Sequence, residues 1–106
     1  MGKKLVRDLI PKHAVNDKDA RFTKCEDEEQ YIYFLRKKLF EECEEFVSGD
    51  CKDIYEVADI VEILKTFVEY RGYTWKQVMQ KRREKELMNG GFKNRILFEK
   101  QIDYNS

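Results

Sequence analysis

The chain has 106 residues, a length typical of one domain, so a single domain is expected over residues 1–106. Its 21 Lys and Arg residues balance 21 Asp and Glu residues, which argues against binding to a nucleic-acid polymer or an anionic membrane. Hydrophobic residues make up 42% of the sequence, enough to form a core, so a disordered chain is not expected.

The N-terminal residues 1–26 show no sustained helical periodicity. Pro11 nevertheless fits the first turn of a short helix, which Asp8 would cap. In residues 28–47 the apolar side chains recur at steps of three and four, which predicts an amphipathic helix. The residues of this repeat are Ile32, Leu35, Leu39, Cys43 and Phe46.

The turn-forming residues 48–52 make a connection short enough to place the next helix antiparallel to the first. That helix is predicted over residues 53–71, and Gly72 stops it because glycine accepts the left-handed conformation common at helix ends. Thr74 and Gln77 then have the spacing of a capping box, which predicts a third helix to about residue 88.

Residues 95–98 are predicted to form a short strand paired with residues 21–23. The whole pattern predicts an all-α fold, an antiparallel helical bundle with short irregular or strand-like N- and C-terminal segments. The second helix has an apolar arc too wide for one antiparallel neighbour, so we expect a homodimer or homotetramer. The arc consists of Ile54, Val57, Ile60, Val61, Ile63, Leu64, Phe67 and Val68.

Two acidic clusters flank the predicted hairpin turn. Glu42 and Glu45 fall on one flank of the first helix, and Lys38 shares that flank. Glu56 projects within the apolar arc of the second helix, and Asp59 lies at the edge of that arc. Because the hairpin folds between the clusters, Glu45 is expected to lie near Glu56. Glu42 is likewise expected to face Asp59.

Four carboxylates that converge in this way repel one another strongly unless a cation lies among them. Hard oxygen ligands select Mg²⁺, with Mn²⁺ as the alternative. A competing interpretation is that the acids form solvated helix faces, which is the expected state of Glu41 and Glu44. The position of Glu56 among apolar residues favours the cation site.

Two cations of the third helix, Arg82 and Lys85, share the face that is expected to pack inward. Phosphate oxygens between these cations and a metal-loaded acidic cluster would explain that position. The alternative is a structural salt bridge to Glu42 or Asp59. Residues 90–91 fit a helix stop better than a phosphate contact, and no P-loop or GxGxxG fingerprint is present.

The remaining residue types exclude several other chemistries. Three cysteines without a CxxC pair and a single histidine, His13, argue against a zinc site and against a catalytic triad. His13 is interpreted as a surface residue. The unpaired cysteines and the absence of an apolar leader favour a reducing, cytoplasmic location. No apolar run approaches the ~20 residues of a membrane span.

The acidic clusters match a known motif in order and spacing. Residues 41–45 read EExxE, residues 56–59 read ExxD, and Lys38 precedes the first cluster. The chain thereby resembles the all-alpha nucleotide pyrophosphohydrolase superfamily, which includes MazG-type enzymes and phosphoribosyl-ATP pyrophosphohydrolase. Residues 4–11, KLVRDLIP, and a GGF segment followed by Arg-Ile resemble a small MazG-like subgroup.

The resemblance implies a MazG-like bundle with Mg²⁺-dependent cleavage between the α- and β-phosphates of a nucleoside triphosphate, which yields a monophosphate and pyrophosphate. A non-catalytic helical module that binds a nucleotide or protein and a phosphoribosyl-ATP pyrophosphohydrolase are the alternatives. Glu41 is a possible general base, but the base is left unassigned. The implied metal ligands and catalytic residues are Glu42, Glu45, Glu56 and Asp59. The implied phosphate-binding residues are Lys38, Arg82 and Lys85.

Overall fold

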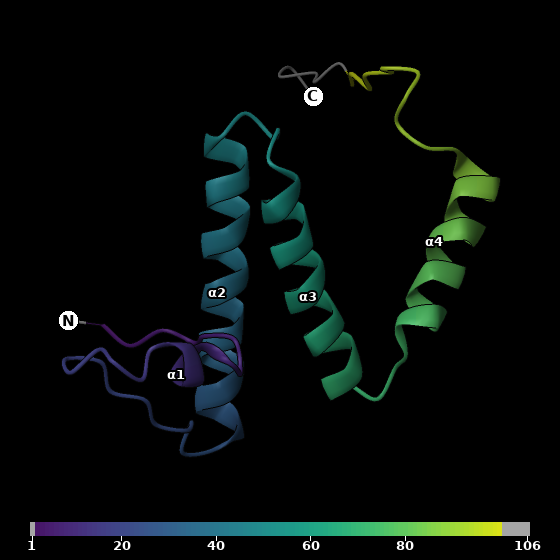
Figure 1. Cartoon of the computed structure of the whole chain (residues 1–106). Helices are drawn as coiled ribbons and strands as arrows, with labels where there is room; N and C mark the ends of the chain where they lie inside the picture. Colours follow the sequence, from purple (N-terminus) through teal and green to yellow (C-terminus); the bar gives the residue numbers. More distant parts are fainter. Residues whose placement is uncertain (1, 101–106) are drawn as a thin grey trace, which may run out of the picture.

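The computed structural model describes residues 2–100, and every regular element in that range is a helix. The elements are α1 (Ile10–His13), α2 (Glu28–Ser48), α3 (Ile54–Tyr70) and α4 (Trp75–Asn89), as Figure 1 shows. The all-α prediction is confirmed for these residues, and the three long helices lie within one residue of their predicted boundaries. None of the described helices is long and apolar enough to cross a bilayer.

α2 and α3 run antiparallel as a hairpin, and local side chains fix where each helix begins (Figure 1). The Asp27 carboxylate accepts a hydrogen bond of 2.8 Å from a backbone amide in the first turn of α2. Asp53 caps α3 in the same way at 2.9 Å. Between the helices, Asp50 and Cys51 adopt left-handed φ angles of 61° and 58°, which reverse the chain within a few residues.

α4 begins and ends as its sequence predicts. Gly72 has a φ of 88° just after α3, a conformation that favours glycine. The Thr74 hydroxyl accepts from the Gln77 amide at 3.1 Å, and the Gln77 side chain accepts from the Thr74 amide at 2.8 Å, so the capping box is confirmed. Gly90, with a φ of 81°, donates its amide to the Glu86 carbonyl at 2.8 Å and ends the helix.

Two predictions for the end segments are wrong. Leu9, rather than Asp8, stands at the N-cap of α1, and no side chain caps this helix. Pro11 does lie in its first turn, as predicted. No strand forms within residues 2–100: Arg95 has a φ of 60°, and residues 96–98 are almost fully exposed. A two-stranded pairing without an apolar surface beneath it is only marginally stable, which explains the missing strand.

The packed centre of the molecule lies between α2 and α3. Leu35 of α2 and Ile63 of α3 are 3% and 8% exposed, the most buried hydrophobic side chains of the described residues. At the end of the hairpin away from the turn, the rings of Tyr31 and Tyr70 meet edge to face with centroids 5.8 Å apart. The core is therefore a two-helix seam.

α4 extends away from this seam. Within residues 2–100 it contacts α3 but not α2, and the Cα radius of gyration is 19.2 Å, against ~13 Å for a compact chain of about 100 residues. Val57, Val61 and Leu64 form an exposed stripe on α3. One chain therefore leaves uncovered a large part of the apolar arc that its sequence predicts will be buried.

Candidate metal and phosphate site

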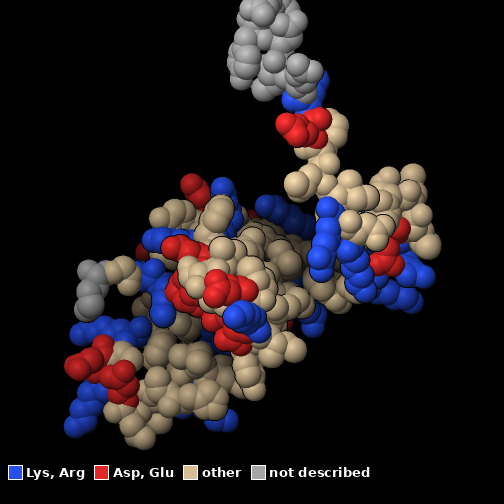
Figure 2. Space-filling model, turned by 90° about the horizontal axis from the view of Figure 1, so that it is seen from above, with Lys and Arg blue, Asp and Glu red and all other residues tan. Residues whose placement is uncertain are grey.

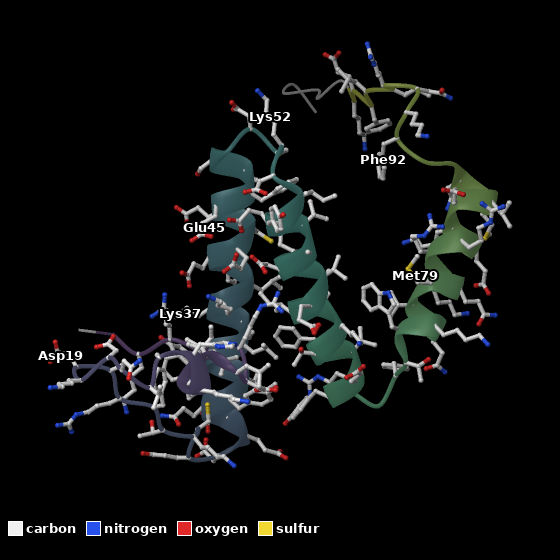
Figure 3. All side chains as sticks on the ribbon, in the orientation of Figure 1. Asp19, Lys37, Glu45, Lys52, Met79 and Phe92 are labelled. Carbon is white, nitrogen blue, oxygen red and sulfur yellow. The ribbon has the colours of Figure 1, made fainter. Side chains whose placement is uncertain are left out.

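Three predicted metal ligands come together between the two helices of the hairpin. Glu42 of α2 and Glu56 and Asp59 of α3 each contribute one carboxylate oxygen, and these three oxygens lie within 4.8 Å of one another. Figure 3 shows oxygen-bearing side chains of α2 and α3 gathered along this seam. The hairpin thus brings the ExxD pair of one helix against an acid of the EExxE segment on the other.

A second carboxylate group shares Glu42 and lies along α2. Glu41, Glu42 and Glu45 offer oxygens that also lie within 4.8 Å of one another. Glu45 therefore joins the acidic region through its own helix, and its negative charge reaches Glu56 across the seam. Glu41, expected to lie on a solvated helix face, is half-buried, and one of its carboxylate oxygens belongs to this group.

Glu42 is the buried member of the first group, and burial makes its negative charge costly. Glu42 is only 7% exposed, and Lys38 compensates it with its ammonium nitrogen 3.2 Å from Oε1. A hydrogen bond shared with Glu42 raises the pKa of Glu56 to about 7, and burial and the charges of Glu42, Glu45 and Asp59 act in the same direction. Two carboxyl groups held this close to one another do not readily ionise together.

The donor set fits a hard divalent cation. Oε2 of Glu56 is buried and receives no hydrogen bond from any donor in residues 2–100. An orphaned carboxylate oxygen is costly to desolvate, and a cation would satisfy it. Glu42, Glu56 and Asp59 supply only carboxylate oxygens, which suit Mg²⁺ or Mn²⁺ and are poor partners for softer metals.

The N-terminal segment brings a cation that sequence analysis did not assign to the site. Nη2 of Arg7 lies 2.7 Å from Oδ1 of Asp59. The segment also forms one wall of a cavity of about 910 Å³, whose other walls include Lys38, Glu42 and Asp59. Arg7 lies within the KLVRDLIP segment, but nothing in that segment's periodicity indicates a contact with α3.

The expected position of the α4 cations is wrong for a single chain. Arg82 and Lys85 are exposed, and Arg82 pairs with Glu86 of its own helix at 3.1 Å. Arg82 therefore makes neither of the predicted contacts, to Glu42 or to Asp59. The inward face was inferred from helical periodicity, but within residues 2–100 α4 contacts only α3, and that contact leaves Arg82 and Lys85 exposed.

Comparison of the chain with family models, curated proteins and solved structures found no match. The resemblance to nucleotide pyrophosphohydrolases therefore rests on the residues themselves.

Proposed function

We propose that the chain is a Mg²⁺-dependent pyrophosphohydrolase of nucleoside triphosphates or related nucleotides, with Mn²⁺ as the alternative metal. The observation that supports this most is the interhelical group of Glu42, Glu56 and Asp59, in which a buried Glu56 oxygen has no donor. The solvated-face interpretation does not account for Glu42, which is 7% exposed. The EExxE and ExxD spacing, through its resemblance to nucleotide pyrophosphohydrolases, supports hydrolysis of a phosphoric anhydride as the reaction class.

In the proposed reaction, the oxygen of a water molecule bonds to the α-phosphorus and the bond from that phosphorus to the bridging oxygen breaks. Pyrophosphate leaves, and the proton released by the water passes to solvent or to a carboxylate of the acidic group. Glu42, Glu56 and Asp59, with Glu45, would hold the metal. When bound, Mg²⁺ neutralises phosphate oxygens and lowers the pKa of a water. Lys38, beside Glu42, places a cation where phosphate oxygens would enter.

A substrate panel with direct detection of pyrophosphate tests this proposal. The protein is expected to release pyrophosphate from at least one nucleoside triphosphate with Mg²⁺, and to stop when EDTA removes the metal. The panel includes phosphoribosyl-ATP, whose preferred hydrolysis would favour the alternative enzyme. Nucleotide binding without any turnover would favour the non-catalytic module and overturn the proposal.

We further propose that the active form is a homodimer or homotetramer in which α4 completes the site of another copy. α4 carries five Lys and Arg residues against two Glu residues. By contrast, acidic side chains gather at the turn end of the α2–α3 hairpin, which Figure 2 shows from above. The exposed stripe of Val57, Val61 and Leu64 supplies an apolar surface for the same association. Arg82 and Lys85 would then reach phosphates bound by the partner.

Light scattering at micromolar concentration is expected to show an oligomer. The variant Arg82→Ala/Lys85→Ala is expected to raise KM or lower kcat while Mg²⁺ binding is preserved, because these residues contact phosphate rather than metal. Mixed after subunit exchange with inactive Glu56→Gln, this variant is expected to regain activity, since each mixed pair contains one intact site.

The matched control mixes Glu56→Gln with Glu42→Gln. Both defects then lie in the acidic half of the site, so no activity should return. A monomer in solution, or an oligomer in which the first mixture stays inactive, would contradict the assignment of α4 to the partner's site.

A further inference from the structure

The cavity beside the acidic group extends well beyond it. One wall is the N-terminal segment, residues 4–10 with His13, and the opposite wall is formed by α2 and α3. Its volume of about 910 Å³ lies within the range of small-molecule sites, roughly 300–1,000 Å³. The metal ligands occupy only part of this wall, so the cavity has space for much more than phosphate.

The two ends of the cavity differ in chemistry. Along α2 the lining runs from Glu42 to Tyr31, a distance of roughly 16 Å at 1.5 Å per residue. Because α3 runs antiparallel, Asp59 lies at the Glu42 end and Thr66 toward the Tyr31 end. The Glu42 end carries the carboxylates of Glu42 and Asp59 beside the ammonium group of Lys38. The Tyr31 end offers an aromatic ring and the Thr66 hydroxyl, and the charge of Asp8 in the N-terminal wall acts on Tyr31.

The Arg7–Asp59 ion pair sits at the Glu42 end and is weakly held. The two side chains are 57% and 38% exposed, and ion pairs of this exposure contribute little to stability. A cation bound by Asp59 would compete directly with the guanidinium for the same carboxylate. Arg7 would then lie free in the cavity, with a planar fork of donors that suits a phosphate group.

We propose that Arg7 is a substrate-phosphate-binding residue, which exchanges Asp59 for a phosphate when metal binds, and that the nucleoside occupies the cavity toward Tyr31 and Thr66. This inference rests on the proposed function for its substrate class. It makes the N-terminal segment the second wall of the nucleotide site. It also predicts opposite effects of one substitution on two ligands, because Arg7 competes with the metal and assists the substrate.

The experiment measures binding by calorimetry in full-length Arg7→Ala and wild type. The probes are Mn²⁺ alone, inorganic tripolyphosphate with Mg²⁺, and a non-hydrolysable α,β-methylene nucleoside triphosphate with Mg²⁺. Arg7→Ala is expected to bind Mn²⁺ at least as tightly as wild type. It should bind both phosphate probes about 10- to 100-fold more weakly, the usual range for lost charge-assisted hydrogen bonds. Arg36→Ala, which removes an exposed arginine of α2 outside the cavity, is the matched control and should leave all three affinities unchanged.

A second variant, Thr66→Phe, fills the opposite end of the cavity. It is expected to lower the affinity for the nucleotide analogue at least about tenfold while the affinity for tripolyphosphate is unchanged. The unchanged tripolyphosphate binding also shows that the variant is folded. If Arg7→Ala binds tripolyphosphate as tightly as wild type does, Arg7 does not bind phosphate. If Thr66→Phe loses affinity for tripolyphosphate and for the nucleotide analogue to the same extent, the nucleoside does not lie at the Thr66 end. All of these readings are independent of hydrolysis, so a chain that binds but does not turn over would defeat the proposed function alone.

Discussion

Glu56→Gln is expected to lower pyrophosphate release at least about 100-fold while the helical fold is kept, because it removes one of the proposed metal ligands with almost no change in shape. Glu56 belongs to the interhelical carboxylate group, and its Oε2 is the buried oxygen without a donor. Kinetics in saturating Mg²⁺ and circular dichroism measure the two effects. Glu44→Gln is the matched control, since Glu44 is an exposed acid of the same sequence run outside both carboxylate groups.

The same substitution is expected to change the pH dependence of stability. The pKa of Glu56 rises from its ordinary value of 4.5 to about 7 in the fold, so the native state binds more protons than the unfolded chain between these values. The metal-free wild type should therefore lose stability as pH rises from about 4.5 to 7, and this loss should be absent from Glu56→Gln. Above pH 7 the variant should melt no lower than wild type, and Mg²⁺ should stabilise wild type more.

Full activity of the Glu56→Gln variant would show that Glu56 is not a metal ligand. A variant that unfolds readily, with no effect of Mg²⁺ on either melt, would make Glu56 a structural residue. Loss of activity in Glu44→Gln as large as in Glu56→Gln would show that acidity alone, rather than the interhelical position, determines the effect.

Leu35→Ala is expected to destabilise the protein by about 2–5 kcal/mol, because it leaves a cavity at the most buried position of the α2–α3 seam. This is a large fraction of the ~5–15 kcal/mol that stabilises a typical domain. Metal binding should weaken in parallel, since Glu42 on α2 and the ExxD pair on α3 are held together by the same seam.

Chemical denaturation with and without Mg²⁺ measures this effect. Leu97→Ala is the matched control: Leu97 is almost fully exposed, so the same change should alter stability by less than about 0.5 kcal/mol. Equal destabilisation by the two substitutions would show that the seam is not the core.

The sequence predicts the parts of this molecule that depend on neighbouring residues. The Asp and Thr caps and the glycine stops act within one or two turns, so the three long helices could be located closely. The short connection between α2 and α3 also forces the hairpin, and with it the approach of Glu42 to Asp59. Local chemistry thus determines the acidic half of the candidate site.

Contacts between distant segments were not predictable in the same way. The Arg7–Asp59 pair joins residues 52 positions apart, and no periodicity of the N-terminal segment indicates it. For α4, the apolar positions predict a face that packs against another surface, but they do not identify the helix, or the copy of the chain, that provides that surface. The strand predicted at residues 95–98 fails for the related reason that β propensity needs a partner surface.

Product analysis in ¹⁸O-labelled water tests the central claim most directly, because it reports which phosphorus water attacks. With Mg²⁺ and a nucleoside triphosphate that the protein accepts, mass spectrometry is expected to find the label in the nucleoside monophosphate and none in the pyrophosphate. Label in free phosphate with formation of a nucleoside diphosphate, label in the pyrophosphate, or the absence of metal-dependent turnover across the substrate panel would contradict the account.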